Sequence, residues 1–398
     1  MEISRVHMNV DRTTGTIETS LGSVARRFTL PLVALVCWSS PLAGQEHGQF
    51  QLVLELNYVS AEKTIDLYRG LSGRPSEIAE LRGSQLAMQT TGLLAHRKLD
   101  LSGLERALEA AKFNQNLGDD VYRMKEARDS VGPLAELYNE LRRRNFGQKV
   151  ASTVEQLFPA GAKVRGTLPI YFVAFGHQNI DAFVRRVIWH GDQPLFAREQ
   201  EGEPTIVVNL AKAVHYGRTL DERFLGLLST VAHEVFHAAF DAYKDESPLW
   251  RDYYARRPSY FDALTDLAQN EGIAYYLSLI QSSRGRLPAD WEQRVANVFA
   301  SFNRSAEELL APGLTPARAQ ELLLSANTSG YWESYGAMAG MVMAKQIDQG
   351  LGRGALAETI ANGPMDFFRK YIDLMRRSPS MPLLSSRVVQ AIQNTSRR

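Results

Sequence analysis

The residues best suited to chemistry are His233, Glu234 and His237, in an otherwise uncharged segment from Val231 to Ala238. The two histidines are about one helical turn apart, so on a helix both imidazoles can reach one metal ion from the same face. The glutamate between them can reach a water bound to that ion, a pattern typical of zinc hydrolases. The alternative is a pair of helix histidines hydrogen-bonded to neighbouring carbonyls. The intervening glutamate and the apolar surroundings favour the metal site.

A helix from about Leu220 to Tyr243 is expected to carry this motif. Thr219 and Glu222 have the spacing of a capping box at its start. Apolar residues then recur on one helical stripe, away from the histidines: Leu220, Phe224, Leu227, Leu228, Val231, Val235 and Ala238. This helix is apolar on nearly every side, which predicts that it is buried.

A zinc site of this kind needs a third protein ligand and an open position for water. Glu271 is the predicted third ligand, because it is an acid in an otherwise apolar turn of a second expected helix, Tyr260 to Ser282. A buried carboxylate is costly unless a positive charge pairs with it, and Zn²⁺ would supply that charge. The alternatives are pairing with a basic side chain such as Arg251, or exposure to solvent.

Two further features belong to this second helix. Ser259 and Asp262 have the spacing of a capping pair at its start. Gly272, directly after the predicted ligand, is expected to let this helix approach the zinc helix closely.

At these motifs the chain resembles the gluzincins, the thermolysin-like zinc metallopeptidases in which two histidines and a glutamate from a following helix hold the metal. Asn270, Glu271 and the small residue after them resemble the second gluzincin motif, although the gap after His237 is longer than in thermolysin. The chain is more similar to an uncharacterised, mostly bacterial group of zinc-dependent peptidases, which shares the Glu-Gly-Ile-Ala turn and a tyrosine-rich segment, here Gly330 to Ala339. The resemblance covers about Leu168 to Gly352 and is specific at the zinc motif.

The resemblance implies roles for further residues. Glu234 would act as the general base and not as a ligand. Tyr331 is the first choice and Tyr335 the second for stabilising the oxyanion, and aromatic packing beside Trp332 is the alternative for both. Asp241 matches a thermolysin-like acid, and Asp241, Asn270 or a backbone carbonyl could accept an imidazole N–H and orient a ligand.

Between Gly166 and Leu210 the spacing of apolar residues no longer follows a helical period, which predicts a small sheet. Leu168 to Phe175, Phe183 to Trp189 and Thr205 to Leu210 are rich in β-branched and aromatic residues. In gluzincins an edge strand beside the zinc helix binds extended substrate through main-chain hydrogen bonds. Val207, Val208 and Asn209 are the candidates for this contact, and an internal strand covered on both faces is the alternative.

The expected architecture is α+β and predominantly helical. A helical region at 45–165, which could act as a lid or a wall of the substrate cleft, precedes a zincin-like domain at 166–398 with a small sheet. After the zinc helices, further helices are expected at 291–302, 316–324, 335–349 and 364–376. Met338, Met341 and Met343 are interpreted as core residues rather than a copper site.

Residues 1–44 are predicted to be a secretory signal peptide. Arg26 and Arg27 precede an apolar run too short to span a bilayer comfortably, and small residues follow as far as Gly44, after which cleavage is expected. The alternative is a buried terminal strand. With a signal peptide, the protein would be exported, periplasmic or extracellular, with no stable membrane anchor after cleavage. The single cysteine, Cys37, lies within this signal, so the mature chain would form no disulfides.

The composition fits an ordinary globular enzyme, with 398 residues, 44% hydrophobic and 22% charged. A net charge of +1 gives no support for nucleic-acid binding. The sequence therefore predicts an exported zinc peptidase acting on peptides or proteins. The alternatives are a zinc-binding relative without turnover, and a latent or narrowly specific processing peptidase.

Overall fold

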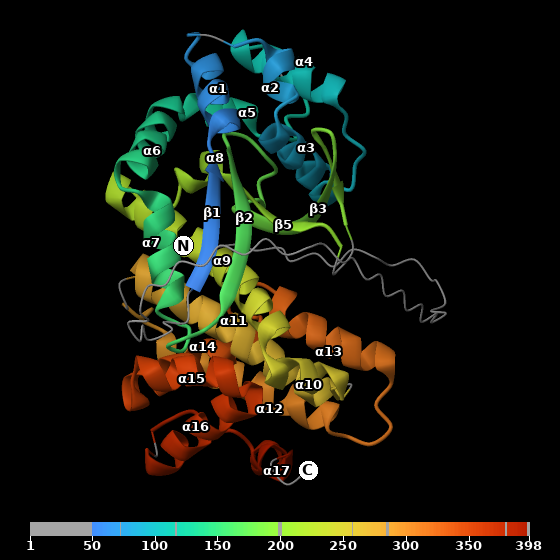
Figure 1. Cartoon of the computed structure of the whole chain (residues 1–398), viewed down its shortest axis with the longest axis vertical. Coiled ribbons are helices and arrows are strands. Elements are labelled where there is room, and N and C mark those ends of the chain that lie inside the picture. Colours follow the sequence, from blue (N-terminus) through green and yellow to red (C-terminus); the bar gives the residue numbers. More distant parts are fainter. Residues whose placement is uncertain are drawn as a thin grey trace, which may run out of the picture.

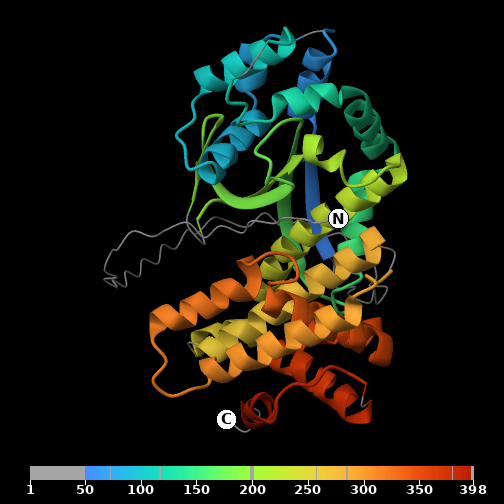
Figure 2. The same cartoon turned by 180° about the vertical axis from the view of Figure 1, so that it is seen from behind.

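The computed structural model describes residues 50–395 apart from 72, 116–117, 198–200, 257, 284–285 and 379. The fold is α+β and predominantly helical, which confirms the predicted class. Figures 1 and 2 show a small sheet wrapped by the earlier helices at one end of the molecule and a bundle of later helices at the other. The predicted signal peptide lies outside the described residues.

Five strands form one mixed sheet in the order β1-β2-β5-β3-β4. Their bounds are β1 Phe50–Asn57, β2 Val164–Val173, β3 Ala182–His190, β4 Gln193–Phe196 and β5 Glu203–Asn209. The first three in this order are parallel, and β3 runs antiparallel to both β5 and β4. Sequence periodicity predicted β2, β3 and β5 but missed the two outer strands.

Strand β1 carried a signal that could have been read. Its residues alternate strictly between half-buried and exposed, with Phe50, Leu52, Leu54 and Leu56 facing the interior. It pairs in register with β2 from Phe50 opposite Val164 to Asn57 opposite Tyr171. The region predicted to be helical at 45–165 therefore contributes a strand to the sheet, and the predicted boundary falls inside β2.

The prediction that Val207, Val208 and Asn209 lie on an edge strand is wrong. Strand β5 is internal, since it pairs with β2 on one side and with β3 on the other. All three residues are at most 3% exposed. Both edges of the strand are already hydrogen-bonded within the sheet, so it cannot add a peptide there. The continuous apolar run therefore reflects the alternative interpretation, an internal strand covered on both faces.

The helices before the metal motif surround the sheet. They are α1 Val59–Tyr68, α2 Pro75–Ala79, α3 Arg82–Leu94, α4 Leu101–Lys112, α5 Met124–Asp129, α6 Val131–Arg143, α7 Phe146–Glu155 and α8 Leu210–Ala213. Those that follow are α9 Leu220–Glu246, α10 Pro248–Ala255, α11 Tyr260–Ser283, α12 Trp291–Leu309, α13 Pro316–Thr328, α14 Tyr335–Leu351, α15 Arg353–Asn362, α16 Pro364–Arg377 and α17 Ser386–Thr395. None of the helices in the described residues is long and apolar enough to cross a membrane.

Helix α9 connects the two halves of the molecule, since it packs against β2, β3 and β5 and also against α11. Both predicted caps are present. Thr219 and Glu222 form a reciprocal capping box at the start of α9. At the start of α11, Ser259 Oγ accepts from the backbone N–H of Asp262, whose carboxylate accepts from Ser259. The caps therefore set where both helices begin, and packing of their apolar surfaces stabilises them.

Helix α11 packs between α9 and α14, and its contact with α14 brings the two backbones unusually close. A Cβ added to Gly272 would lie 2.3 Å from the carbonyl carbon of Gly340, and one added to Gly340 would lie 1.8 Å from the carbonyl oxygen of Ala268. The prediction that Gly272 serves close approach to the zinc helix is therefore wrong in its partner, which is α14. Met338, Met341 and Met343 of α14 are fully buried, as predicted for core residues.

Candidate metal centre

Helix α9 places the two histidines and the glutamate of the motif at its buried middle. His233 is 0% and Glu234 is 1% exposed, and the ring centroids of His233 and His237 are 4.7 Å apart. The spacing of one helical turn aligns the two rings, as the sequence predicted. Burial of three polar side chains in one helix segment is costly unless they bind a common partner.

Glu271 reaches the same point from α11. Its Oε2 lies 3.4 Å from His237 Nε2 and 3.7 Å from His233 Nε2. One ligand atom from each of these three residues lies within 4.8 Å of the others. Two ligands bound tetrahedrally to zinc at the usual bond lengths are about 3.3 Å apart, so the distances from Glu271 to the two histidines are close to those around a zinc ion.

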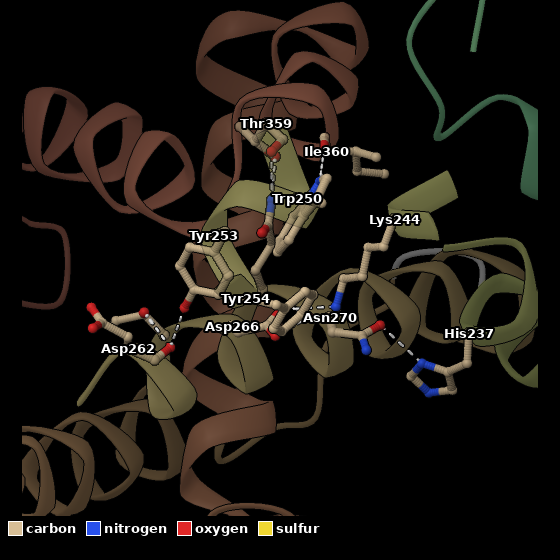
Figure 3. Close-up of polar contacts among 12 residues, drawn as sticks. His237, Lys244, Trp250, Tyr253, Tyr254, Asp262, Asp266, Asn270, Thr359 and Ile360 are labelled. Carbon is tan, nitrogen blue, oxygen red and sulfur yellow. Dashed lines mark hydrogen bonds and ion pairs between the residues drawn. The ribbon is translucent and has the colours of Figure 1, made fainter. Parts of the chain in front are cut away.

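His237 is oriented by the residue that precedes the acidic ligand. His237 Nδ1 lies 3.0 Å from Asn270 Oδ1, a contact drawn in Figure 3. Because an amide oxygen can only accept, Nδ1 donates the proton, and the lone pair of the neutral ring is on Nε2, which faces the cluster. The structure thus places Asn270 in contact with His237, where the predicted supporting role requires it. Asp241, the other candidate, has an exposed side chain one turn further along α9.

The other two ligands also have supporting contacts. Asn327 Nδ2 of α13 donates to Glu271 Oε1 over 2.8 Å, which leaves Oε2 directed at the histidines. Ser278 Oγ of α11 lies 3.4 Å from His233 Nδ1. Such contacts restrict the rotamer of each ligand before a metal binds. Asn327 is further held by the loop after α13, because Ser334 Oγ donates to its backbone carbonyl.

The two predicted tyrosines differ in their surroundings. Tyr331 lies in the loop before α14 and packs its ring against Tyr275, with centroids 5.4 Å apart, and Tyr275 in turn packs edge-on against His233. Tyr335 is buried, and its hydroxyl donates to the backbone carbonyl of Leu322 over 2.6 Å. Only the ring of Tyr275 therefore separates Tyr331 from His233, whereas the hydroxyl of Tyr335 is bound to α13.

Sequence reasoning missed Tyr275, Ser278 and Asn327. The first two carried a signal, since they follow Glu271 by four and seven residues and so share its helical face. Asn327 carried no local signal, because α13 reaches Glu271 only through the tertiary packing of α13 and α14 on α11.

The charges of the cluster favour a cation. Burial lowers the pKa of His237, but the carboxylate of Glu271 opposes this effect, with help from Glu234 and the contact to Asn270. The result is a pKa raised from 6.5 to about 9 in the metal-free protein. A site that binds a proton this tightly has a negative electrostatic potential, and a divalent cation can take the proton's place.

Comparison with known proteins gives one match. The family model described as "Putative zinc dependent peptidase (DUF5700)" matches residues 76–380, more than half of the chain and including all three candidate ligands. No curated protein and no solved structure matches the chain.

Proposed function

Because the chain belongs to the family that carries this description, we propose that it hydrolyses peptide bonds at a zinc ion held by His233, His237 and Glu271. The observation that carries the proposal is the convergence of these three ligand atoms from α9 and α11 within 4.8 Å. Two histidines and a glutamate from a following helix are the gluzincin ligand set, and we assign the site to that class.

Zinc held at this site would polarise the scissile carbonyl and lower the pKa of a coordinated water to near 7. Glu234 follows His233 directly in α9, and its carboxylate is near enough to His237 to raise the pKa of that imidazole. In the proposed mechanism Glu234 accepts the proton of the attacking water and delivers it to the leaving amine. Asn270 and Asn327 keep His237 and Glu271 in position throughout.

The oxyanion that forms during hydrolysis needs a hydrogen-bond donor. We assign this role to Tyr331, because its ring packs edge-on against Tyr275, which in turn packs against His233, whereas Tyr335 is buried against α13 through its bond to Leu322. Tyr331→Phe retains the ring and removes only the hydroxyl. It should lower kcat by about 10²-fold or more with little change in bound zinc. Unchanged kcat in Tyr331→Phe would remove the hydroxyl from the mechanism.

The decisive experiment combines metal analysis with peptide cleavage. The purified protein should contain one zinc per chain, and His233→Ala and Glu271→Ala should lose most of it. Glu234→Gln should keep its zinc while cleavage falls by about 10²- to 10⁴-fold. Glu246→Gln, an exposed position at the end of α9, is the matched control and should retain both properties. Retained turnover in Glu234→Gln would exclude it as the base, and zinc loading that survives Glu271→Ala would exclude the ligand set.

We also propose that the enzyme is exported, on the basis of the predicted signal at residues 1–44. Its substrates would then be extracellular or periplasmic peptides or proteins. Mass spectrometry of the protein made in its natural host should give a chain that begins near Gln45. An intact N-terminus on protein recovered from the cytosol would contradict export.

A further inference from the structure

A pocket of about 260 Å³ lies beside the candidate metal centre. Its walls come from α10, α11 and α13 and from the link before α11: Tyr253, Tyr254, Pro258, Ala263, Asp266, Leu267, Asn270, Glu271 and Asn327. Figure 3 shows Asn270 beside His237, with Tyr254 and Asp266 next to Asn270 and Tyr253 further from the histidine. The volume is just below the range typical of sites for drug-sized ligands, so the pocket suits a single large side chain.

The pocket adjoins the metal centre. Three of its lining residues belong to that centre, namely the ligand Glu271 and the two asparagines that orient the ligands. The side chains of His237 and Glu271 are 14% and 11% exposed, whereas that of His233 is 0% exposed. A peptide whose carbonyl approaches the cluster from this side would place a neighbouring side chain over the pocket.

Most of the polar groups around the pocket are hydrogen-bonded within the protein. The hydroxyl of Tyr253 donates to the backbone carbonyl of Asp262, and that of Tyr254 donates to Asp266 Oδ2. Asn270 Oδ1 accepts from His237, and Asn327 Nδ2 donates to Glu271. These bonds leave mainly ring and aliphatic surface for a ligand, together with the buried Oδ1 of Asn327, which accepts no hydrogen bond from the described residues.

Asp266, the carboxylate of the pocket outside the metal centre, is paired with a lysine of α9. Lys244 Nζ of α9 lies 2.9 Å from Asp266 Oδ1, and its side chain is only 8% exposed. The same ammonium lies 4.4 Å from the ring centre of Phe240 and 4.6 Å from that of Trp250, where cation–π attraction holds it. A basic ligand side chain would therefore find a carboxylate already paired, with a fixed positive charge behind it.

From this geometry we infer that the pocket binds a large uncharged side chain of the substrate, aromatic or branched aliphatic, next to the bond that is cleaved. The inference rests on the proposed peptidase function. Apolar and aromatic walls would favour such a side chain over alanine by on the order of 10- to 100-fold in kcat/KM. Charged side chains would be disfavoured, because they would leave water for neutral amide groups and a carboxylate that is already paired with Lys244.

Cleavage of a peptide library by the zinc-loaded enzyme tests the specificity. We expect cleavage beside Phe, Tyr, Leu or Met, and Ala263→Phe, which fills the pocket, should reduce kcat/KM for these peptides by about tenfold or more. The same variant should change cleavage of alanine-containing peptides much less, and Ala263→Ser, which leaves the space open, should resemble the wild type. A wild-type preference for charged residues would overturn the inference, as would an unaltered profile in a folded Ala263→Phe protein.

Binding separates this inference from the proposed function. N-acetyl-phenylalaninamide, N-acetyl-alaninamide and N-acetyl-lysinamide can be compared by saturation-transfer NMR on the zinc-loaded Glu234→Gln protein, which needs no turnover. Selective binding of the phenylalanine amide that Ala263→Phe abolishes supports the pocket even if no peptide is cleaved. Equal signals from all three amides would overturn the pocket while leaving hydrolysis intact. Should Ala263→Phe not fold, Leu267→Ala, which enlarges the pocket, should shift cleavage toward larger side chains, and an unchanged profile would again contradict the inference.

Discussion

Replacement of Gly340 by alanine tests whether the contact between α11 and α14 positions the metal site. The new methyl group would lie 1.8 Å from the carbonyl oxygen of Ala268 and 2.9 Å from Cα of Gly272. Both atoms belong to the backbone of a regular helix, so no side chain can rotate away to make room. The helices themselves must move apart.

The size of this movement follows from the distances. Ordinary contacts of a Cβ begin at 3.4 Å, so relief of the overlap with Ala268 requires a separation of about 1.6 Å. Overpacking of a core usually costs about 1–3 kcal/mol, and a clash between two backbones should cost about 3 kcal/mol or more. Zinc ligands tolerate errors of only about 0.2 Å, so even a fraction of this shift in α11 would displace Glu271 enough to weaken zinc binding by about tenfold or more.

Two measurements check the prediction. Urea unfolding followed by circular dichroism gives the free energy of unfolding, and competition with a chromophoric chelator gives the zinc affinity. Gly132→Ala is the matched control, because this helical glycine has open space around it and the change should be neutral or stabilise by up to about 1 kcal/mol. Stability within about 0.5 kcal/mol of the wild type in Gly340→Ala would refute the packing argument. A loss of stability with unchanged zinc affinity would refute the link between this contact and the metal site.

Three further predictions concern the site and its support. Asn327→Ala should lower zinc affinity by about 10- to 100-fold with a near-native fold, and chelator competition showing no change would contradict a positioning role. Lys244→Met leaves the partly buried Asp266 without its cation and should destabilise the protein by about 1–3 kcal/mol in urea unfolding, whereas adding Asp266→Asn should recover part of the loss, and purely additive effects would exclude the pair. In metal-free protein the pKa of His237 is raised to about 9, so its proton stabilises the fold fully below pH 6.5, and this contribution should be lost as the pH rises through 9. Urea unfolding of chelator-treated protein should show this decline, His237→Gln should not, and identical pH profiles would contradict the coupling.

Much of the metal centre could be predicted from the sequence because its determinants are local. The spacing of His233 and His237 fixes their common face once a helix forms, and Thr219 and Glu222 cap that helix within its own first turn. Glu271 could be identified because an acid in an apolar turn requires a cation nearby. Asn270 followed from its place beside that acid. These inferences need only periodicity, capping and the cost of burying charge.

Other features depend on which segments meet in space. Whether Thr205–Asn209 lies at the edge or the centre of the sheet depends on β1 and β3, whose pairing partners are set by strand order, and an apolar run permits either position. A glycine at position 272 indicates that another backbone approaches closely, but the sequence does not identify which helix it belongs to. Asn327 meets Glu271 only because α13 and α14 pack on α11. Local sequence thus determined the ligands and their helices, whereas tertiary packing alone decided their neighbours, since contacts between distant segments are selected by the fit of whole surfaces.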